Sequence, residues 1–150
     1  MGILGCGIMG SGIAQVSARS GYQVVVSEIN GDLLNRGLAS INSALARSVK
    51  KGRLPQRDKD STWARIKGTT NTRGFSDCDL VIEAVTEDMA LKKEVFAELD
   101  KICPEHAVLA SNTSVLSIID MAAATSRPEK VLGMHFFNPV PVMALLEVVK

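Results

Sequence analysis

Short apolar runs alternate with longer segments of helical periodicity along the whole chain, and this alternation limits the possible folds most. The apolar runs occupy residues 1–5, 22–28, 66–71, 79–85, 107–112, 130–136 and 144–149. Helical patterns occupy residues 11–20, 32–50, 56–66, 87–103 and 114–125 between them. Strands that alternate with helices are typical of a mostly parallel sheet with helices on both faces. We therefore predict an α/β fold with a doubly wound sheet.

The segment after the second expected strand predicts a helical hairpin. Its apolar residues recur at steps of four, three, four and four residues, which draws one stripe along a helix. These residues are Leu34, Leu38, Ile41, Leu45 and Val49. Residues 51–55, Lys-Gly-Arg-Leu-Pro, interrupt the helix, and residues 56–66 predict a shorter helix that returns along the first.

Length and composition exclude several classes of protein. A chain of 150 residues fits one domain, and 46% hydrophobic residues are normal for a globular fold. A net charge of +1 offers no broad basic surface to nucleic acid, and no apolar run is long enough to cross a membrane. Three cysteines without a CxxC pair favour reduced thiols. We predict a cytoplasmic protein with no metal site, no nucleic acid and no membrane partner.

A glycine-rich loop follows the first expected strand and opens the first helix. Its residues are Gly5, Cys6, Gly7, Ile8, Met9 and Gly10, a GxGxxG pattern. In this context the first glycine allows a tight turn, the second admits a pyrophosphate, and the third lets the helix pack on the strand. The free N–H groups of the helix would then face the phosphates. The alternative is a tight turn without a ligand; Cys6 needs only its small size here.

The second expected strand ends at Glu28, 18 residues after Gly10. A carboxylate at this position accepts hydrogen bonds from the ribose hydroxyls of a dinucleotide and repels a 2′-phosphate. The pattern therefore predicts NAD rather than NADP as the cofactor. The alternative is an exposed acid at a strand end.

Four segments together resemble one enzyme family. They are GCGIMGSGIAQ, VIEAVTEDMALKKEVFAELD, ASNTSVLSI and GMHFFNPVPVMALLEVVK. They resemble the NAD-binding domain of L-3-hydroxyacyl-CoA dehydrogenases, including 3-hydroxybutyryl-CoA dehydrogenases, and the resemblance covers essentially all of residues 1–150. It implies a Rossmann-type fold for this domain. The family's second, helical domain supplies part of the acyl pocket and the dimer interface. Because the chain ends at Lys150, we expect that domain to be absent here, so that this chain alone binds NAD but turns over poorly.

The resemblance implies a catalytic group of three residues. His135 matches the family's catalytic histidine, which takes the proton of the 3-hydroxyl; imidazole suits this because it titrates near neutral pH. Glu147, twelve residues later, matches its glutamate partner, and we expect a proline-stiffened reversal to bring the two together on neighbouring strands. Ser114 matches the serine near the substrate oxygen and the cofactor. The alternatives are a core histidine, an edge-strand acid, and an N-cap for a helix that begins at Val115.

Other matches concern the cofactor and coenzyme A. Asn138, Glu87 and Lys92 match cofactor contacts, with turn chemistry and solvated helix charges as the respective alternatives. Lys51 matches a lysine placed against coenzyme A phosphates, and a helix C-terminus would equally attract it. Where this chain has Glu28, the family usually has aspartate.

The leading interpretation is NAD-dependent, reversible oxidation of L-3-hydroxyacyl-CoA to 3-oxoacyl-CoA, in fatty-acid β-oxidation or butanoate metabolism. The resemblance implies an acyl-CoA partner and a homodimer when the helical domain is present. One alternative is a related dehydrogenase of a free hydroxy acid. Another is a non-catalytic NAD-binding protein.

Overall fold

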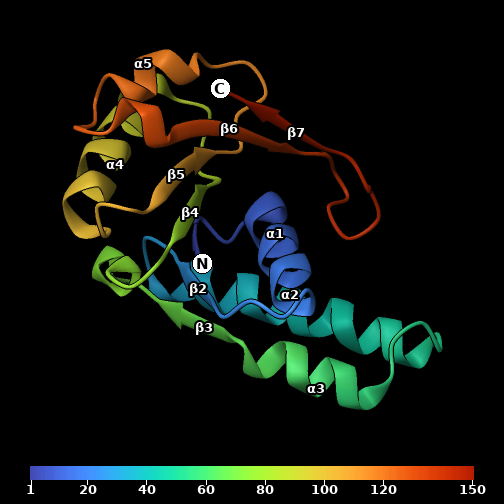
Figure 1. Ribbon diagram of the computed structural model, residues 1–150. Helices are drawn as coiled ribbons and strands as arrows, with labels where there is room; N and C mark the ends of the chain where they lie inside the picture. Colours follow the sequence, from blue (N-terminus) through green and yellow to red (C-terminus); the bar gives the residue numbers. More distant parts are fainter.

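The computed structural model describes all residues from 1 to 150 and contains one seven-stranded sheet (Figure 1). Its strand order is β3-β2-β1-β4-β5-β6-β7. The strands are β1 Gly2–Leu4, β2 Val24–Ser27, β3 Ile66–Thr69, β4 Leu80–Glu83, β5 Val108–Ser111, β6 Val131–Phe136 and β7 Leu146–Val149. The helices are α1 Ile8–Arg19, α2 Gly31–Lys50, α3 Gln56–Ala64, α4 Met89–Ile102 and α5 Ile118–Ala122. Short 3₁₀ turns occupy Thr72–Phe75 and Pro128–Lys130.

Helices cover both faces of the sheet, which confirms the predicted doubly wound α/β fold. Strands β1 to β6 run parallel, and only β7 is antiparallel. Figure 1 shows α1, α2 and α3 together on one side and α4 and α5 on the other. One core joins α1 and α2 to the sheet through Ile13 and Ile41. A second core joins α4 and α5 through Phe96 and Met121.

The helical hairpin after β2 is also confirmed. The Asn30 side chain begins α2 by accepting a hydrogen bond from the Leu33 N–H, and Gly52, at φ +68°, follows its end. Helix α3 then returns from Gln56 and packs against both α1 and α2. None of the helices combines the length and apolar character needed to cross a membrane.

Two helices, α1 and α5, differ most from the prediction, while the ends of the others differ by at most two residues. Helix α1 begins at Ile8 rather than residue 11, because the end of the glycine loop already has helical backbone. Helix α5 covers only Ile118–Ala122 of the expected 114–125, and Ser117, not Ser114, is its N-cap. The alternative role of Ser114 as an N-cap is excluded, because side chains hold this segment as a turn: Thr113 Oγ1 accepts from the Leu116 N–H at 3.0 Å.

A crevice forms at the edge of the sheet where the connections after two neighbouring strands lead to opposite faces. After β1 the chain enters α1 on one face, whereas after the neighbouring β4 it enters α4 on the other face. Ligands of open α/β sheets bind outside the carboxyl ends of the strands at such a point. At the far side, β6 and β7 form an antiparallel pair in which His135 lies directly opposite Glu147. This confirms the expected strand reversal.

Helix α2 packs closely against the glycine loop through Gly37. A Cβ atom at this position would lie 2.2 Å from Cys6 Sγ and 2.4 Å from the Cys6 carbonyl oxygen. We expect Gly37→Ala to destabilise the protein by about 1–3 kcal/mol, the usual cost of overpacking, and to weaken NAD binding by displacing the loop. Urea unfolding and NAD titration measure the two effects.

Gly31→Ala is the matched control for Gly37→Ala. It lies at the start of the same helix, and a Cβ there meets nothing within 4 Å. Its stability and NAD affinity should equal or exceed those of the wild type. Equal behaviour of the two variants would contradict a close contact between α2 and the loop.

Candidate active site

A large cleft lies at the carboxyl ends of β1, β2 and β4, at this crevice. Its volume is about 830 Å³. The residues that line it come from the ends of these strands and the loops after them, from the turn after β3, and from α2 and α4; they include Gly5, Gly7, Glu28, Leu33, Ala84, Val85, Thr86 and Leu91. This volume and position suit an extended ligand that crosses the end of the sheet.

The three glycines of the loop each have the geometry expected of a phosphate-binding turn. Gly5 has φ +93°, and an added Cβ would lie 2.8 Å from the Ala84 carbonyl oxygen. Around Gly7 there is open space, with nothing within 4 Å of a Cβ. A Cβ on Gly10 would lie 1.8 Å from the Gly5 carbonyl oxygen. The loop therefore turns tightly, leaves room at Gly7, and brings the start of α1 against β1.

The Glu28 carboxylate is held at the edge of this cleft by two backbone groups. Its Oε1 accepts from the Cys6 N–H at 3.0 Å, and its Oε2 accepts from the Ile29 N–H at 2.9 Å. Since each carboxylate oxygen has a second lone pair, both oxygens can still accept hydrogen bonds from a ligand. Ile8 is exposed beside the loop, and Met9 lines a neighbouring cavity.

The Cys6 side chain does not line the large cleft. Its side chain is buried, and burial, followed by the nearby charge of Glu28, raises its pKa to about 11. At pH 8 a thiol with this pKa is about one part in a thousand thiolate, the reactive form. We expect iodoacetamide to label Cys6 only after unfolding in urea, as measured by peptide mass spectrometry. Rapid labelling of the native protein would mean that the loop opens away from α2.

A second cavity adjoins the first, since Ala84 and Val85 line both. Its volume is about 280 Å³. The other residues that line it are Met9, Glu87, Asn112, Ser114, His135, Phe136, Phe137 and Asn138. The cavity therefore brings together the glycine loop, the turn after β5 and the end of β6.

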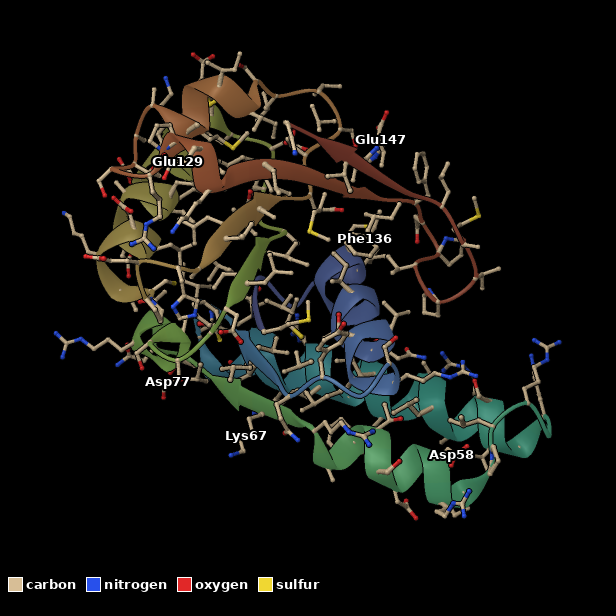
Figure 2. All side chains as sticks on the ribbon, in the orientation of Figure 1. Asp58, Lys67, Asp77, Glu129, Phe136 and Glu147 are labelled. Carbon is tan, nitrogen blue, oxygen red and sulfur yellow. The ribbon has the colours of Figure 1, made fainter.

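Ser114, His135 and Glu147 form a line of hydrogen bonds at this second cavity. Ser114 Oγ lies 3.0 Å from His135 Nε2, and His135 Nδ1 lies 3.2 Å from Glu147 Oε2. Because a carboxylate only accepts, Nδ1 carries the proton and Nε2 is left to exchange one with Ser114 or a ligand. Figure 2 shows Glu147 on β7, the antiparallel neighbour of β6.

The residues after His135 hold the imidazole in place. The Phe137 ring lies 4.5 Å from the imidazole, centroid to centroid, and the Phe136 N–H donates to Asn112 Oδ1 at 2.9 Å. The Phe136 side chain packs against the α1 side of the core (Figure 2). Val140 is buried against Gly12 of α1. The HFFNPVP run thus fixes the histidine to the glycine-loop helix.

The remaining sequence-based candidates occupy different places. Asn138 lines the second cavity, and Glu87 lines it while accepting from the Ser114 N–H at 3.2 Å. Lys92 is not a solvated charge, as one alternative held, because its ammonium is buried against Glu83 at 2.6 Å. Lys51 is exposed at the C-terminal end of α2 and lines neither cavity. Glu83 was missed, since a single acid at the end of a nearly continuous apolar strand does not show in sequence which residue it pairs with.

A glycine loop, an acid after β2 and a cleft at the point of divergence define a dinucleotide-binding domain. The family model described as "3-hydroxyacyl-CoA dehydrogenase, NAD binding domain" matches residues 1–150. The chain belongs to the 3-hydroxyacyl-CoA dehydrogenase family and forms its NAD-binding domain.

Three relatives illustrate the match. A 3-hydroxybutyryl-CoA dehydrogenase of Mycobacterium tuberculosis is 49% identical over 151 aligned positions, covering 100% of this chain and 53% of the relative. The solved structure of (S)-3-hydroxybutyryl-CoA dehydrogenase from Ralstonia eutropha has a TM-score of 0.95 at 48% identity, covering 98% of this chain and 52% of that one. A glyoxysomal fatty-acid β-oxidation multifunctional protein of Brassica napus is 40% identical, covering 99% of this chain and 20% of that protein. The chain spans about half the length of the first two.

Proposed function

We propose that the protein is an NAD-dependent 3-hydroxyacyl-CoA dehydrogenase that interconverts an L-3-hydroxyacyl-CoA and its 3-oxoacyl-CoA. The observation that carries this proposal is the Ser114–His135–Glu147 line of hydrogen bonds beside a dinucleotide cleft. The names of the relatives supply the substrate class. The reaction would serve fatty-acid β-oxidation or butanoate metabolism.

Each member of the line has a distinct part in the proposed reaction. His135 Nε2 takes the proton of the 3-hydroxyl. Bound NAD would supply the acceptor for the hydride that leaves C3. Glu147 fixes the imidazole tautomer through Nδ1 and stabilises the imidazolium that forms. The Ser114 hydroxyl holds the substrate oxygen close to Nε2. In the reverse direction His135 returns the proton to the 3-oxo oxygen.

The binding roles follow from position and charge. The glycine loop and Glu28 hold the dinucleotide, Glu87 contacts it, and Asn138 lies near its nicotinamide end. Lys92 is 1% exposed and lines neither cavity, so the cofactor role proposed for it is exerted through Glu87. Lys51, exposed at the end of α2, offers a cation to the coenzyme A phosphates.

The function is tested by NADH oxidation in the protein of full natural length. We expect turnover with acetoacetyl-CoA and little with free acetoacetate at the same concentration. Preference for the free acid would favour the hydroxy-acid alternative, and no turnover with either would favour a non-catalytic binding protein. Binding of NADH, followed by its fluorescence, is the control for a correctly folded sample.

We expect NAD to bind at least about tenfold more tightly than NADP, a difference of about 1.4 kcal/mol. The reason is that a 2′-phosphate would face the Glu28 carboxylate at the cleft edge. Calorimetric titration of both cofactors measures the preference. Glu28→Gln should narrow it, and equal affinities in the wild type would contradict this role of Glu28.

A further inference from the structure

A buried ion pair lies behind the second cavity. Lys92 Nζ lies 2.6 Å from Glu83 Oε1, and the two side chains are 1% and 0% exposed. Glu83 is the last residue of β4, and Lys92 lies in the first turn of α4. Neither residue lines either cavity. Burying two charges costs free energy, and an apolar pair of the same shape is often as stable or more so. Stability alone therefore does not explain why this pair is charged.

The Glu83 carboxylate accepts hydrogen bonds at the ends of two neighbouring strands. Its Oε1 also accepts from the Val85 N–H at 2.6 Å, directly after β4. Its Oε2 accepts from Ser111 Oγ at 2.6 Å, at the end of β5. Ser111 Oγ in turn accepts from the Thr113 N–H at 3.3 Å. The carboxylate thus fixes both the Lys92 ammonium and the start of the turn that carries Ser114.

Lys92 connects this buried pair to the catalytic line through Glu87. Lys92 Nζ lies 3.8 Å from Glu87 Oε2. The same Oε2 accepts from Thr113 Oγ1 at 2.8 Å, while Glu87 Oε1 accepts from the Ser114 N–H at 3.2 Å. Ser114 Oγ then lies 3.0 Å from His135 Nε2. An unbroken series of charged and hydrogen-bonded groups therefore runs from Glu83 to the imidazole.

We propose that Glu83 and Lys92 are positioning residues for the dehydrogenase reaction. Glu83 holds the Lys92 ammonium beneath Glu87, the ammonium holds the Glu87 carboxylate, and the carboxylate orients Ser114 against His135. The proposal rests on the proposed function, because the reaction is what this orientation serves. It assigns to Glu83 a part that the sequence pattern did not indicate.

The test compares Glu83→Gln, Lys92→Met and the double variant in the protein of full natural length. Each single variant leaves one buried charge without its partner, so its Tm should fall. The double variant removes both charges, and its Tm should recover towards the wild-type value. Its kcat with acetoacetyl-CoA should nevertheless stay low by a factor on the order of 10 to 100, since Glu87 has lost its cation. Its KM should change less than kcat.

The double variant shows whether Glu83 and Lys92 position the catalytic residues or only stabilise the fold. Recovery of kcat together with Tm would show that the pair is only structural and would overturn the proposal. Asp100→Asn is the matched control, because it breaks the largely buried Arg127–Asp100 pair, at 2.6 Å, which shares no hydrogen bond with the catalytic line. This control should lower Tm and leave kcat unchanged.

A second readout does not depend on activity. The nitrogen resonances of the His135 side chain report the Ser114 hydrogen bond at Nε2, and the proposal predicts that the Nε2 resonance shifts in the double variant. An unchanged resonance would overturn the proposal whatever the kinetics. A shifted resonance in a protein whose wild type does not turn over acetoacetyl-CoA would uphold the positioning role and reject the proposed function.

Discussion

The His135→Gln variant should bind NAD as tightly as the wild type and lose turnover roughly 10²–10⁴-fold, the usual worth of a positioned acid–base group. Glutamine retains a hydrogen-bonding side chain between Ser114 and Glu147 but cannot take up the substrate proton. Steady-state kinetics with acetoacetyl-CoA and calorimetric titration of NAD measure the two quantities.

His106→Gln is the control for this experiment. His106 is the only other histidine and pairs on the surface with Asp79, at 2.8 Å from Nε2 to Oδ1. Its replacement should leave both turnover and NAD affinity unchanged. Equal losses in the two variants, or a loss of NAD affinity in His135→Gln, would contradict the assignment of His135 as the base.

The Gly10→Ala variant should lose both stability and NAD binding. Its Cβ would lie 1.8 Å from the Gly5 carbonyl oxygen and 2.8 Å from the Gly5 carbonyl carbon, so either the loop or α1 must move. Overpacking of this kind costs typically 1–3 kcal/mol and occasionally more. If the same displacement is carried into the binding loop, NAD affinity falls about 10- to 100-fold. Thermal unfolding and NAD titration measure the pair of effects.

Gly7→Ala tests the contact with NAD separately from the packing of the loop, because it should change NAD affinity without changing Tm. No protein atom lies within 4 Å of a Cβ at Gly7, so the unliganded protein should keep its wild-type Tm. NAD binding should still weaken, because the new methyl group occupies the space intended for the pyrophosphate. Wild-type NAD affinity in Gly7→Ala would place the phosphates elsewhere.

The fold was predictable because local patterns and global topology agree in this chain. Strands β1, β2, β4 and β5 have nearly continuous apolar sequences, rather than alternating ones, because helices cover both faces of the sheet. The twelve-residue spacing and the prolines between His135 and Glu147 predicted that the chain reverses and brings the two residues together on neighbouring strands. The β6–β7 register confirms this.

The details that sequence patterns missed depend on contacts between distant segments. The shortened α5 follows from side-chain hydrogen bonds at Thr113 and Glu87 that no propensity describes. The sequence left Lys92 open between a cofactor contact and a solvated helix charge, because no pattern shows the Glu83 carboxylate that lies against its ammonium. No sequence pattern indicates that position 37 must be a glycine, because the atoms that leave no room for a side chain belong to Cys6, in a different segment.

The central claim is that His135 and Glu147 act as one unit on the substrate oxygen. A double-mutant cycle with His135→Gln, Glu147→Gln and the variant carrying both tests it most directly, with kcat for acetoacetyl-CoA as the measured quantity. Glu147→Gln keeps the shape of the side chain but removes the charge that stabilises the imidazolium, so it should lower kcat by itself. If the two residues act together, the double variant should be little worse than His135→Gln alone. Losses that multiply independently would contradict the claim and leave Glu147 with a structural role only.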